Sequence, residues 1–404
     1  MIQTIAFGVL GAFALLVGYT YAGYPALLMA LGRRRDPAVP PPAAPEHLPM
    51  ISILVAAYNE ERQIRHTLEG LLALDYPPEK RQIVIVSDAS SDGTDAIVRE
   101  FADRGVELVR VPKRGGKTLA ENAASPHLRG DIVVNTDASI RIRPDALRPM
   151  IAAFADPEVG VVSGTDVSVS ALGDDANKGE ATYVDYEMWV RQLETRAGGI
   201  VGASGCFFAI RAELQHIPAP PHLSRDFSAA LVAHEHGYRA LSMPQSICYV
   251  PRSSDVKAEF RRKVRTFTRG METLHHKRHL LNPFRDALFG WKLFSHKVLR
   301  WALPWGAVLA YLAMGALALE HTAARVLFAL GTLVLAIGAV GWAIARPDRR
   351  LPRWVSMPTY ALVGSAAVLK ASLLALNGQR SPTWEPTRRN VLEVGEAPAA
   401  RAAG

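Results

Sequence analysis

Short apolar runs rich in β-branched residues alternate with amphipathic segments in the first part of the chain after residue 50. The runs that predict strands are residues 51–57, 82–87, 106–111 and 131–136, and the segments that predict helices are 60–74 and 94–104. Strands that alternate with helices are typical of an α/β fold built on a parallel sheet. Ligands of such sheets bind beyond the carboxyl ends of the strands, so a site is expected there.

Much longer uncharged runs occur at both ends of the chain. Residues 2–32 carry no charge and precede three arginines, which predicts a membrane span with a basic stop. A cleaved signal peptide is the alternative, but its basic end would come first. Residues 301–319 and 326–345 predict a hairpin of two spans. Residues 355–376 are interrupted by Lys370 and are a weaker span candidate, with a re-entrant or interfacial segment as the alternative.

Two stretches between these runs have distinct compositions. Residues 36–49 are rich in proline, which indicates an extended linker. Residues 255–299 interleave lysine and arginine with apolar residues, which is typical of an interfacial helix. The predicted organisation is an N-terminal span (1–35), a linker (36–49), a catalytic domain (50–254), basic interfacial helices (255–299), a C-terminal membrane region (300–378) and a tail (379–404).

Composition and charge narrow the possible partners. The chain has 404 residues, of which 49% are hydrophobic, enough for one enzyme domain and several spans. Its net charge of +8 lies largely beside the apolar runs, which indicates anionic lipid headgroups and argues against nucleic acid. Cys206 and Cys248 lack the spacing of metal ligands or of a disulfide framework.

Four polar positions follow predicted strands or open predicted helices. Asp88 lies in a Ser-Asp-rich turn that suits a nucleotide base or ribose, although an ordinary helix cap has the same composition. Lys117 follows two glycines and suits a diphosphate, with a solvated loop lysine as the alternative. Asp137, with Ser139 nearby, suits a divalent cation. Asp226 precedes a helical run, where by itself it would be interpreted as a cap.

Taken together, the order of these motifs resembles the family 2 glycosyltransferases of GT-A fold, over roughly residues 19–389. The matching segments are 56–61, 87–94, 116–117, 137–139, 202–205, 224–226 and 261–270. The resemblance implies an α/β nucleotide-sugar-binding domain that uses Mg²⁺ or Mn²⁺.

The resemblance also implies a role for each matching residue. The nucleotide-sugar residues are Ala57, Tyr58, Glu60, Asp88, Lys117, Asp137, Arg262 and Arg265; the acceptor residues are Gly202, Ser204 and Gly205; the metal residues are Asp137 and Ser139; and the general base is Asp226. For Arg262 and Arg265, a headgroup-binding stripe on an amphipathic helix is the alternative.

Three positions depart from the family pattern. Ser87 stands where the first of two paired aspartates is usual, and Ser139 replaces the second aspartate of the metal motif. Residues 262–266 read Arg-Lys-Val-Arg-Thr where Gln-x-x-Arg-Trp is expected. The threonine offers no apolar face to a product sugar, which weighs against processive synthesis, although Trp189, Phe267 or Trp384 would be possible substitutes.

The sequence therefore predicts an inverting glycosyltransferase of a bacterial-type inner membrane, multi-pass, with its catalytic domain in the cytoplasm. It would move a sugar from a nucleotide-diphosphate donor, expected to be a UDP-sugar, to a membrane lipid or glycan acceptor. A processive β-glycan (exopolysaccharide) synthase is the first alternative, and a nucleotide-binding membrane protein without catalysis is the second. The basic clusters that follow the spans place the amino terminus outside.

Overall fold

The computed structural model describes residues 1–32, 47–169, 178–251, 255–346 and 351–379. Its centre is an eight-stranded sheet with the strand order β3-β2-β1-β4-β7-β6-β8-β5. The strands are β1 (Ile51–Ala57), β2 (Arg81–Ser87), β3 (Val106–Arg110), β4 (Ile132–Asp137), β5 (Arg141–Ile142), β6 (Val159–Val169), β7 (Phe207–Arg211) and β8 (Arg239–Pro251).

The first four strands form the parallel half of the sheet, as the sequence predicts. β1 pairs with β2 and β4, and β2 pairs with β3, in each case in parallel. Every residue of β1 is buried, because helices cover both faces of the sheet there. The carboxyl ends of β1, β2 and β4 therefore lie side by side and carry the motifs at 56–61, 87–94 and 137–139.

The second half of the sheet is mixed, which the expectation of a parallel sheet did not include. β7 runs antiparallel to both β4 and β6, β6 runs parallel to β8, and β5 is antiparallel to β8. β7 begins directly after the glycine-containing segment 202–205. This arrangement sets the segment 202–205 beside the end of β4, since β7 and β4 are neighbours.

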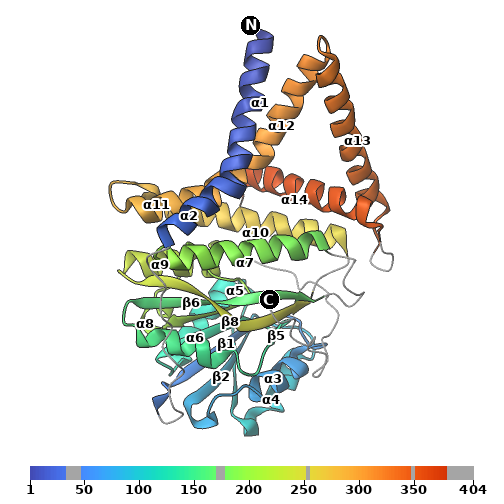
Figure 1. Cartoon of the computed structure of the whole chain (residues 1–404). Helices are drawn as coiled ribbons and strands as arrows, with labels where there is room; N and C mark the ends of the chain where they lie inside the picture. Colours follow the sequence, from blue (N-terminus) through green and yellow to red (C-terminus); the bar gives the residue numbers. More distant parts are fainter. Residues whose placement is uncertain (33–46, 170–177, 252–254, 347–350, 380–404) are drawn as a thin grey trace.

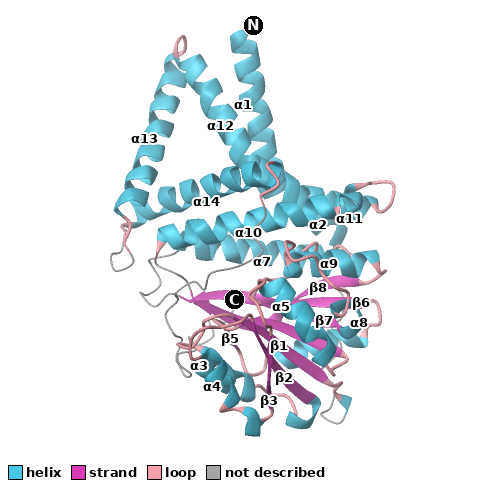
Figure 2. Ribbon diagram, turned by 180° about the vertical axis from the view of Figure 1, so that it is seen from behind, coloured by secondary structure: helices cyan, strands magenta, loops and turns pink. Residues whose placement is uncertain are grey.

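Short helices surround the sheet (Figures 1 and 2). They are α3 (Ile64–Leu72), α4 (Thr94–Arg99), α5 (Lys117–Ala124), α6 (Leu147–Ala152), α8 (Ala212–Gln215) and α9 (Arg225–Glu235). The helix predicted over 60–74 is shorter in the structure. Its first residues instead form a turn in which the Glu60 backbone N–H donates to Thr94 Oγ1 at 2.8 Å.

Three longer helices lie between the sheet and the apolar end of the molecule (Figures 1 and 2). They are α7 (Lys178–Arg196), α10 (Val256–His276) and α14 (Arg353–Leu376). The predicted basic interfacial helix corresponds to α10, whose N-cap residue Asp255 accepts hydrogen bonds from the backbone N–H groups of Lys257 and Ala258. α14 lies along α10 and crosswise to the upright helices (Figure 1).

The upright helices extend away from the domain that contains the sheet (Figure 1). α1 (Ile2–Gly18) continues through a π-helical turn at Tyr19–Gly23 into α2 (Tyr24–Gly32), and α12 (Leu299–Ala318) connects to α13 (Thr322–Ile344). α11 (Ala287–Leu293) leads through a second π-helical turn, η8 (Phe294–Val298), directly into α12. The boundary predicted at residue 300 therefore falls inside a continuous helix.

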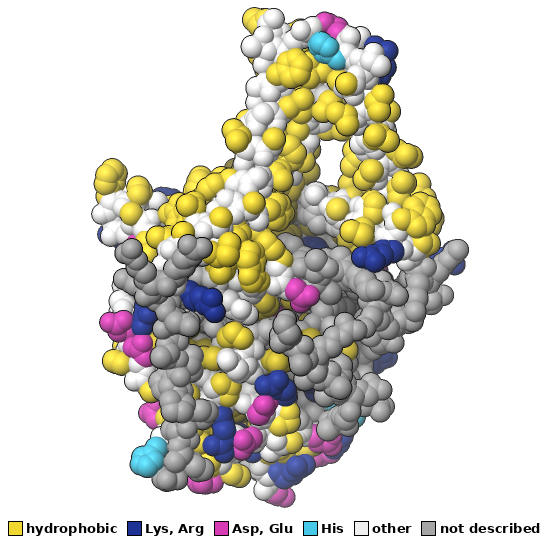
Figure 3. Space-filling view, in the orientation of Figure 1, with side chains coloured by type: hydrophobic (Ala, Val, Ile, Leu, Met, Phe, Trp, Pro, Cys, Tyr) yellow, Lys and Arg dark blue, Asp and Glu magenta, His cyan; other side chains and the backbone are white. Residues whose placement is uncertain are grey.

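Among the described residues, four helices are long and apolar enough to cross a membrane: Ile2–Gly32, Ala287–Ala318, Thr322–Ile344 and Arg353–Leu376. Figure 3 shows hydrophobic side chains gathered over the upright helices. Leu312 and Leu335 are among these exposed apolar side chains, which lipid would cover. Most of the proline-rich linker and nearly all of the tail, including Trp384, lie outside the described residues.

Candidate active site

The turns after β1 and β2 are tied together and strained. The Ser91 backbone N–H donates to Asn59 Oδ1 at 2.8 Å, which links the first motif to the second. Asn59 and Ala89 have positive φ values of 53° and 57°, although neither is glycine. Such conformations are uncommon outside glycine and often mark functional turns.

The Asp88 carboxylate contacts the glycine turn at residues 115–116. Its side chain is fully buried, and its two oxygens accept hydrogen bonds from the backbone N–H groups of Gly115 at 2.8 Å and Gly116 at 2.9 Å. Gly116 has a φ of 96°, which a residue with a Cβ rarely adopts. Asp88 therefore fixes the glycine turn from which Lys117 projects.

A cation–π contact between Arg114 and Tyr58 lies at the same edge of the sheet. The Arg114 guanidinium lies 3.9 Å from the centre of the Tyr58 ring. Arginine stacks well on aromatic faces, so this contact holds the first motif against the glycine turn. Sequence reasoning named Tyr58 for the nucleoside but assigned no role to Arg114.

Lys117 joins three of the predicted motifs. Its Nζ donates to Asp137 Oδ1 at 2.6 Å and to the Gly205 carbonyl at 3.4 Å. Burial opposes the charge on Lys117, but the carboxylates of Asp137 and Glu121 outweigh it and raise its pKa. The side chain is thus a permanent cation at neutral pH, placed between the end of β4 and the segment 202–205.

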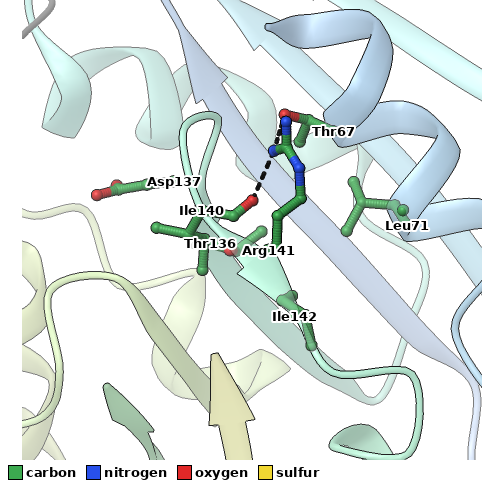
Figure 4. Close-up of a pocket in the computed structure, with 8 residues that line it drawn as sticks. Thr67, Leu71, Thr136, Asp137, Ile140, Arg141 and Ile142 are labelled. Carbon is green, nitrogen blue, oxygen red and sulfur yellow. Dashed lines mark hydrogen bonds between the residues drawn. The ribbon is translucent and has the colours of Figure 1, made fainter. Parts of the chain in front are cut away.

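The turn that carries Asp137 is anchored from behind. Arg141 donates to Thr67 Oγ1 at 3.0 Å and to the Ile140 carbonyl at 2.9 Å, and Thr67 Oγ1 donates to the Ala138 carbonyl at 2.5 Å. Figure 4 shows the Asp137 carboxylate pointing away from this cluster. The small pocket in Figure 4 therefore supports the turn, and the carboxylate faces Lys117 on the other side.

The proposed metal position has one anionic protein ligand. Ser139 is neutral, and the described residues contain no group of three or more His, Cys, Asp or Glu side chains placed to hold an ion. The Asp137 side chain is 29% exposed and is therefore accessible. The residues fit a divalent cation only where phosphate oxygens of a donor and water complete its coordination.

Asp226 lies in the first turn of α9, beside the segment 202–205. Ser224 is the N-cap residue, and the Asp226 carboxylate accepts from the Ser224 hydroxyl. Among the described residues it accepts no backbone N–H, so capping does not explain it. A Cβ added to Gly205 would lie 2.9 Å from Asp226 Oδ2, so the glycine leaves the space that the carboxylate occupies.

The other two predicted acceptor residues have different environments. Ser204 is buried and donates to Asp166 Oδ1 at 2.6 Å, so its hydroxyl supports the segment 202–205 from inside. Gly202 lies against Phe227 and Lys297, the latter from η8. The segment is thus held by the sheet on one side and by a helix that continues into α12 on the other.

The basic helix α10 contributes a residue that sequence reasoning missed. Arg269 donates to Thr118 Oγ1 at 2.7 Å and to the Leu223 carbonyl, and so braces the turn before Asp226. The sequence does contain a signal for Arg269, because residues 262, 265 and 269 share one face of a helix.

Arg262, in contrast, contacts its own helix. It forms two hydrogen bonds to Glu259, at 2.8 and 2.6 Å. Although burial works against ionisation, these bonds lower the pKa of Glu259 to about 2. Arg265 is half-buried on the same helix. The predicted contact of Arg262 and Arg265 with a diphosphate stays a prediction.

Replacing Gly205 with alanine is expected to lower the transfer rate at least about 10-fold with the fold intact, because the new methyl group would displace the Asp226 carboxylate. Steady-state kinetics and a thermal unfolding curve would check this. Gly364→Ala, where an added Cβ would meet no atom within 4 Å, is the control for adding a methyl group alone. Equal activity losses in both variants would contradict the contact with Asp226.

Comparison with known proteins gives consistent matches. A family model described as glycosyl transferase family 2 matches residues 52–217. Beta-monoglucosyldiacylglycerol synthase of Trichormus variabilis is 33% identical over 158 residues, which cover 38% of this chain and 34% of that protein. Poly-beta-1,6-N-acetyl-D-glucosamine synthase of Staphylococcus aureus is 26% identical over 237 residues, which cover 57% of this chain and 56% of that protein.

The chain thus matches about a third to just over half the length of these curated relatives. The mannosyltransferase PcManGT from Pyrobaculum calidifontis, solved with GDP-Man and Mn²⁺, superimposes with a TM-score of 0.72 at 23% identity. That alignment covers 94% of this chain and 100% of the other. The likeness confirms the predicted GT-A fold.

Proposed function

We propose that this chain, whose residues 52–217 match the model of glycosyl transferase family 2, is a glycosyltransferase that inverts the sugar while moving it to a membrane acceptor. The donor is a nucleotide-diphosphate sugar, with a UDP-sugar as the preferred candidate. The acceptor is a lipid or glycan presented at the membrane surface, since relatives of the domain are named as a glycolipid synthase and a polysaccharide synthase.

One observation carries this proposal. Lys117, Asp137 and Asp226, which are far apart in the sequence, meet around Gly205: the lysine reaches the Gly205 carbonyl at 3.4 Å, and the glycine packs against Asp226. A cation, a metal-binding carboxylate and a candidate base on one glycine-lined segment are the groups that sugar transfer from a diphosphate requires.

Each residue then has a chemical task. Lys117 offsets negative charge that builds on the leaving diphosphate, and Asp137 would hold a divalent cation against the same oxygens. The cation supplies Lewis-acid stabilisation when bound. Asp226 accepts the proton of the acceptor hydroxyl as its oxygen attacks the anomeric carbon. One displacement from the face opposite the diphosphate inverts the configuration.

The membrane position is also part of the proposal. The parallel layers α10 and α14 separate the active-site domain from the upright apolar helices, so the site lies close to the plane of lipid headgroups (Figure 1). α10 carries several basic residues, of which Lys257 and Arg261 are exposed, and this suits an anionic leaflet. We therefore place the catalytic domain in the cytoplasm, with the amino terminus outside.

Polymerisation is the second candidate. A processive enzyme must hold the terminal sugar of its product, and Thr266 is exposed and offers no ring. The structure brings another ring to the acceptor side, since Trp301 packs edge-to-face on Phe227 with centroids 6.4 Å apart. This ring comes from α12 and not from α10, and it packs against the apolar cluster that contains Phe227 and Leu274.

The test is to incubate the full-length protein in vesicles with a panel of nucleotide sugars, Mg²⁺ or Mn²⁺, and lipid or glycan acceptors. We expect nucleotide release that rises when an acceptor is present, with a product that carries one or a few sugars. Absence of release with every donor would contradict the proposed activity. A high-molecular-weight product made by the protein alone would instead establish polymerisation.

A further inference from the structure

A buried group of charges joins the catalytic domain to the foot of α12. His296, in η8, lies with Nδ1 2.6 Å from Glu194 Oε1 and Nε2 2.9 Å from Glu187 Oε1. Carboxylates only accept, so an imidazole that contacts one through each nitrogen donates from both and is a cation. Although burial opposes it, attraction to His296 and Arg300 lowers the pKa of Glu187 well below its usual value.

Positive charge is in excess in this group. Arg300 pairs with Glu187, and Arg191 Nε lies 3.4 Å from the same carboxylate. With His296 and Lys297, four cations therefore surround the two carboxylates of Glu187 and Glu194. Unbalanced charge in a partly buried setting is costly, so a bound anion would stabilise this arrangement.

Lys297 is the member of the group that lies nearest the acceptor side. Among the described residues its Nζ has no carboxylate within 4 Å, and it lies 5.3 Å from the centre of the Phe227 ring. A Cβ added to Gly202 would lie 3.6 Å from the same Nζ. Phe227 follows the proposed base, and Gly202 begins the acceptor segment. The residue is half-buried.

The position of Lys297 along the chain points to the source of the anion. It lies in a π-helical turn at the foot of a candidate membrane span, Ala287–Ala318, where headgroups of the facing leaflet would lie. π-Helical turns recur at functional sites. Phosphate is the anion that this layer offers, and a lysine binds it as a point charge.

We propose that Lys297 binds the phosphate of an anionic lipid acceptor and so holds the free hydroxyl of that lipid at Asp226. This inference rests on the proposed function, and it narrows the acceptor to a phosphate-bearing lipid. In the transfer step the hydroxyl oxygen forms a bond to the anomeric carbon while the bond from that carbon to the diphosphate oxygen breaks. The bonding electron pair leaves with the nucleotide diphosphate, and the hydroxyl proton passes to Asp226.

The experiment compares two acceptor lipids in phosphatidylcholine vesicles, phosphatidylglycerol and the uncharged diacylglycerol, for the full-length protein and Lys297→Met. We expect the unmodified protein to prefer phosphatidylglycerol. The variant is expected to show an apparent KM for that lipid raised about 10-fold or more, as loss of a charge-assisted contact implies. Lys297→Arg should retain most of the preference.

Two further measurements separate this proposal from the proposed function. Donor binding should be the same in Lys297→Met as in the unmodified protein, and its loss would instead indicate a failure of the donor site. Lys257→Met removes an exposed charge at the start of α10 and controls for general attraction to anionic vesicles. Preference for diacylglycerol, or equal losses with both lipids, would overturn the proposal, as would inorganic phosphate that stimulates transfer to diacylglycerol through Lys297.

Discussion

Replacing Asp226 with asparagine is expected to lower kcat by roughly 10²- to 10⁴-fold, the usual contribution of a positioned general base. Asparagine keeps the size of the side chain and accepts the hydrogen bond from Ser224, but it cannot take the acceptor proton. The space beside Gly205 is also preserved. Donor binding, measured by titration with UDP or the active nucleotide, should therefore remain within a few fold of the unmodified protein.

Ser224→Ala is the matched control for this prediction. It removes the hydroxyl that donates to Asp226 but leaves the carboxylate, so we expect a loss of less than about 10-fold. The two variants together distinguish proton transfer from local structure. Loss of donor binding or of cooperative unfolding in Asp226→Asn would mean that Asp226 is structural, and so would equal activity losses in the two variants.

The positions of the strand-end motifs were predictable because strand period and turn composition are local properties. Four short β-branched runs placed Asp88 and Asp137 at one edge of a parallel sheet, and the structure has both there. Lys117 reaches Asp137 because Asp88, at the end of β2, holds the glycine turn from which Lys117 projects. Periodicity and turn chemistry were sufficient at this level.

The precise partner of each side chain was less predictable. Asp88 had the right place in the sheet, but its two oxygens accept from the glycine turn, because the buried carboxylate needs donors and Gly115 and Gly116 supply them. Nothing local in residues 87–94 indicates which segment will approach. The mixed half of the sheet was missed for a similar reason, since its pairings join strands distant in sequence.

The sequence pattern also does not predict which residues of the apolar helices contact the site. The sequence offers Phe267, Trp189 and Trp384 as replacements for the missing tryptophan, yet Trp301 is the ring that packs on Phe227. Trp189 instead packs on Tyr186 with ring centroids 5.7 Å apart, and Trp384 lies outside the described residues. Hydropathy places α12 in a membrane but does not specify which of its residues faces the catalytic domain.

Replacing Asp137 with alanine is expected to lower kcat by about 100-fold or more, because the variant loses its one anionic metal ligand in the predicted site. The same change leaves Lys117 without the carboxylate oxygen 2.6 Å from its Nζ. Chelation of divalent ions should inactivate the unmodified protein to a similar degree, and added Mg²⁺ or Mn²⁺ should restore activity to it but not to the variant.

A measurement of metal binding separates the two consequences of that substitution. Mn²⁺ binding in the presence of UDP, followed by electron paramagnetic resonance, should weaken strongly in Asp137→Ala. Lys117→Met is the matched variant, because it removes the other half of the ion pair and keeps the carboxylate, so Mn²⁺ binding should survive while kcat falls. With Ser139 neutral, donor phosphates must supply the remaining charge, and Mn²⁺ should therefore bind far more weakly without UDP. Tight Mn²⁺ binding to the protein alone, or full activity after chelation, would show that Asp137 serves only as the partner of Lys117.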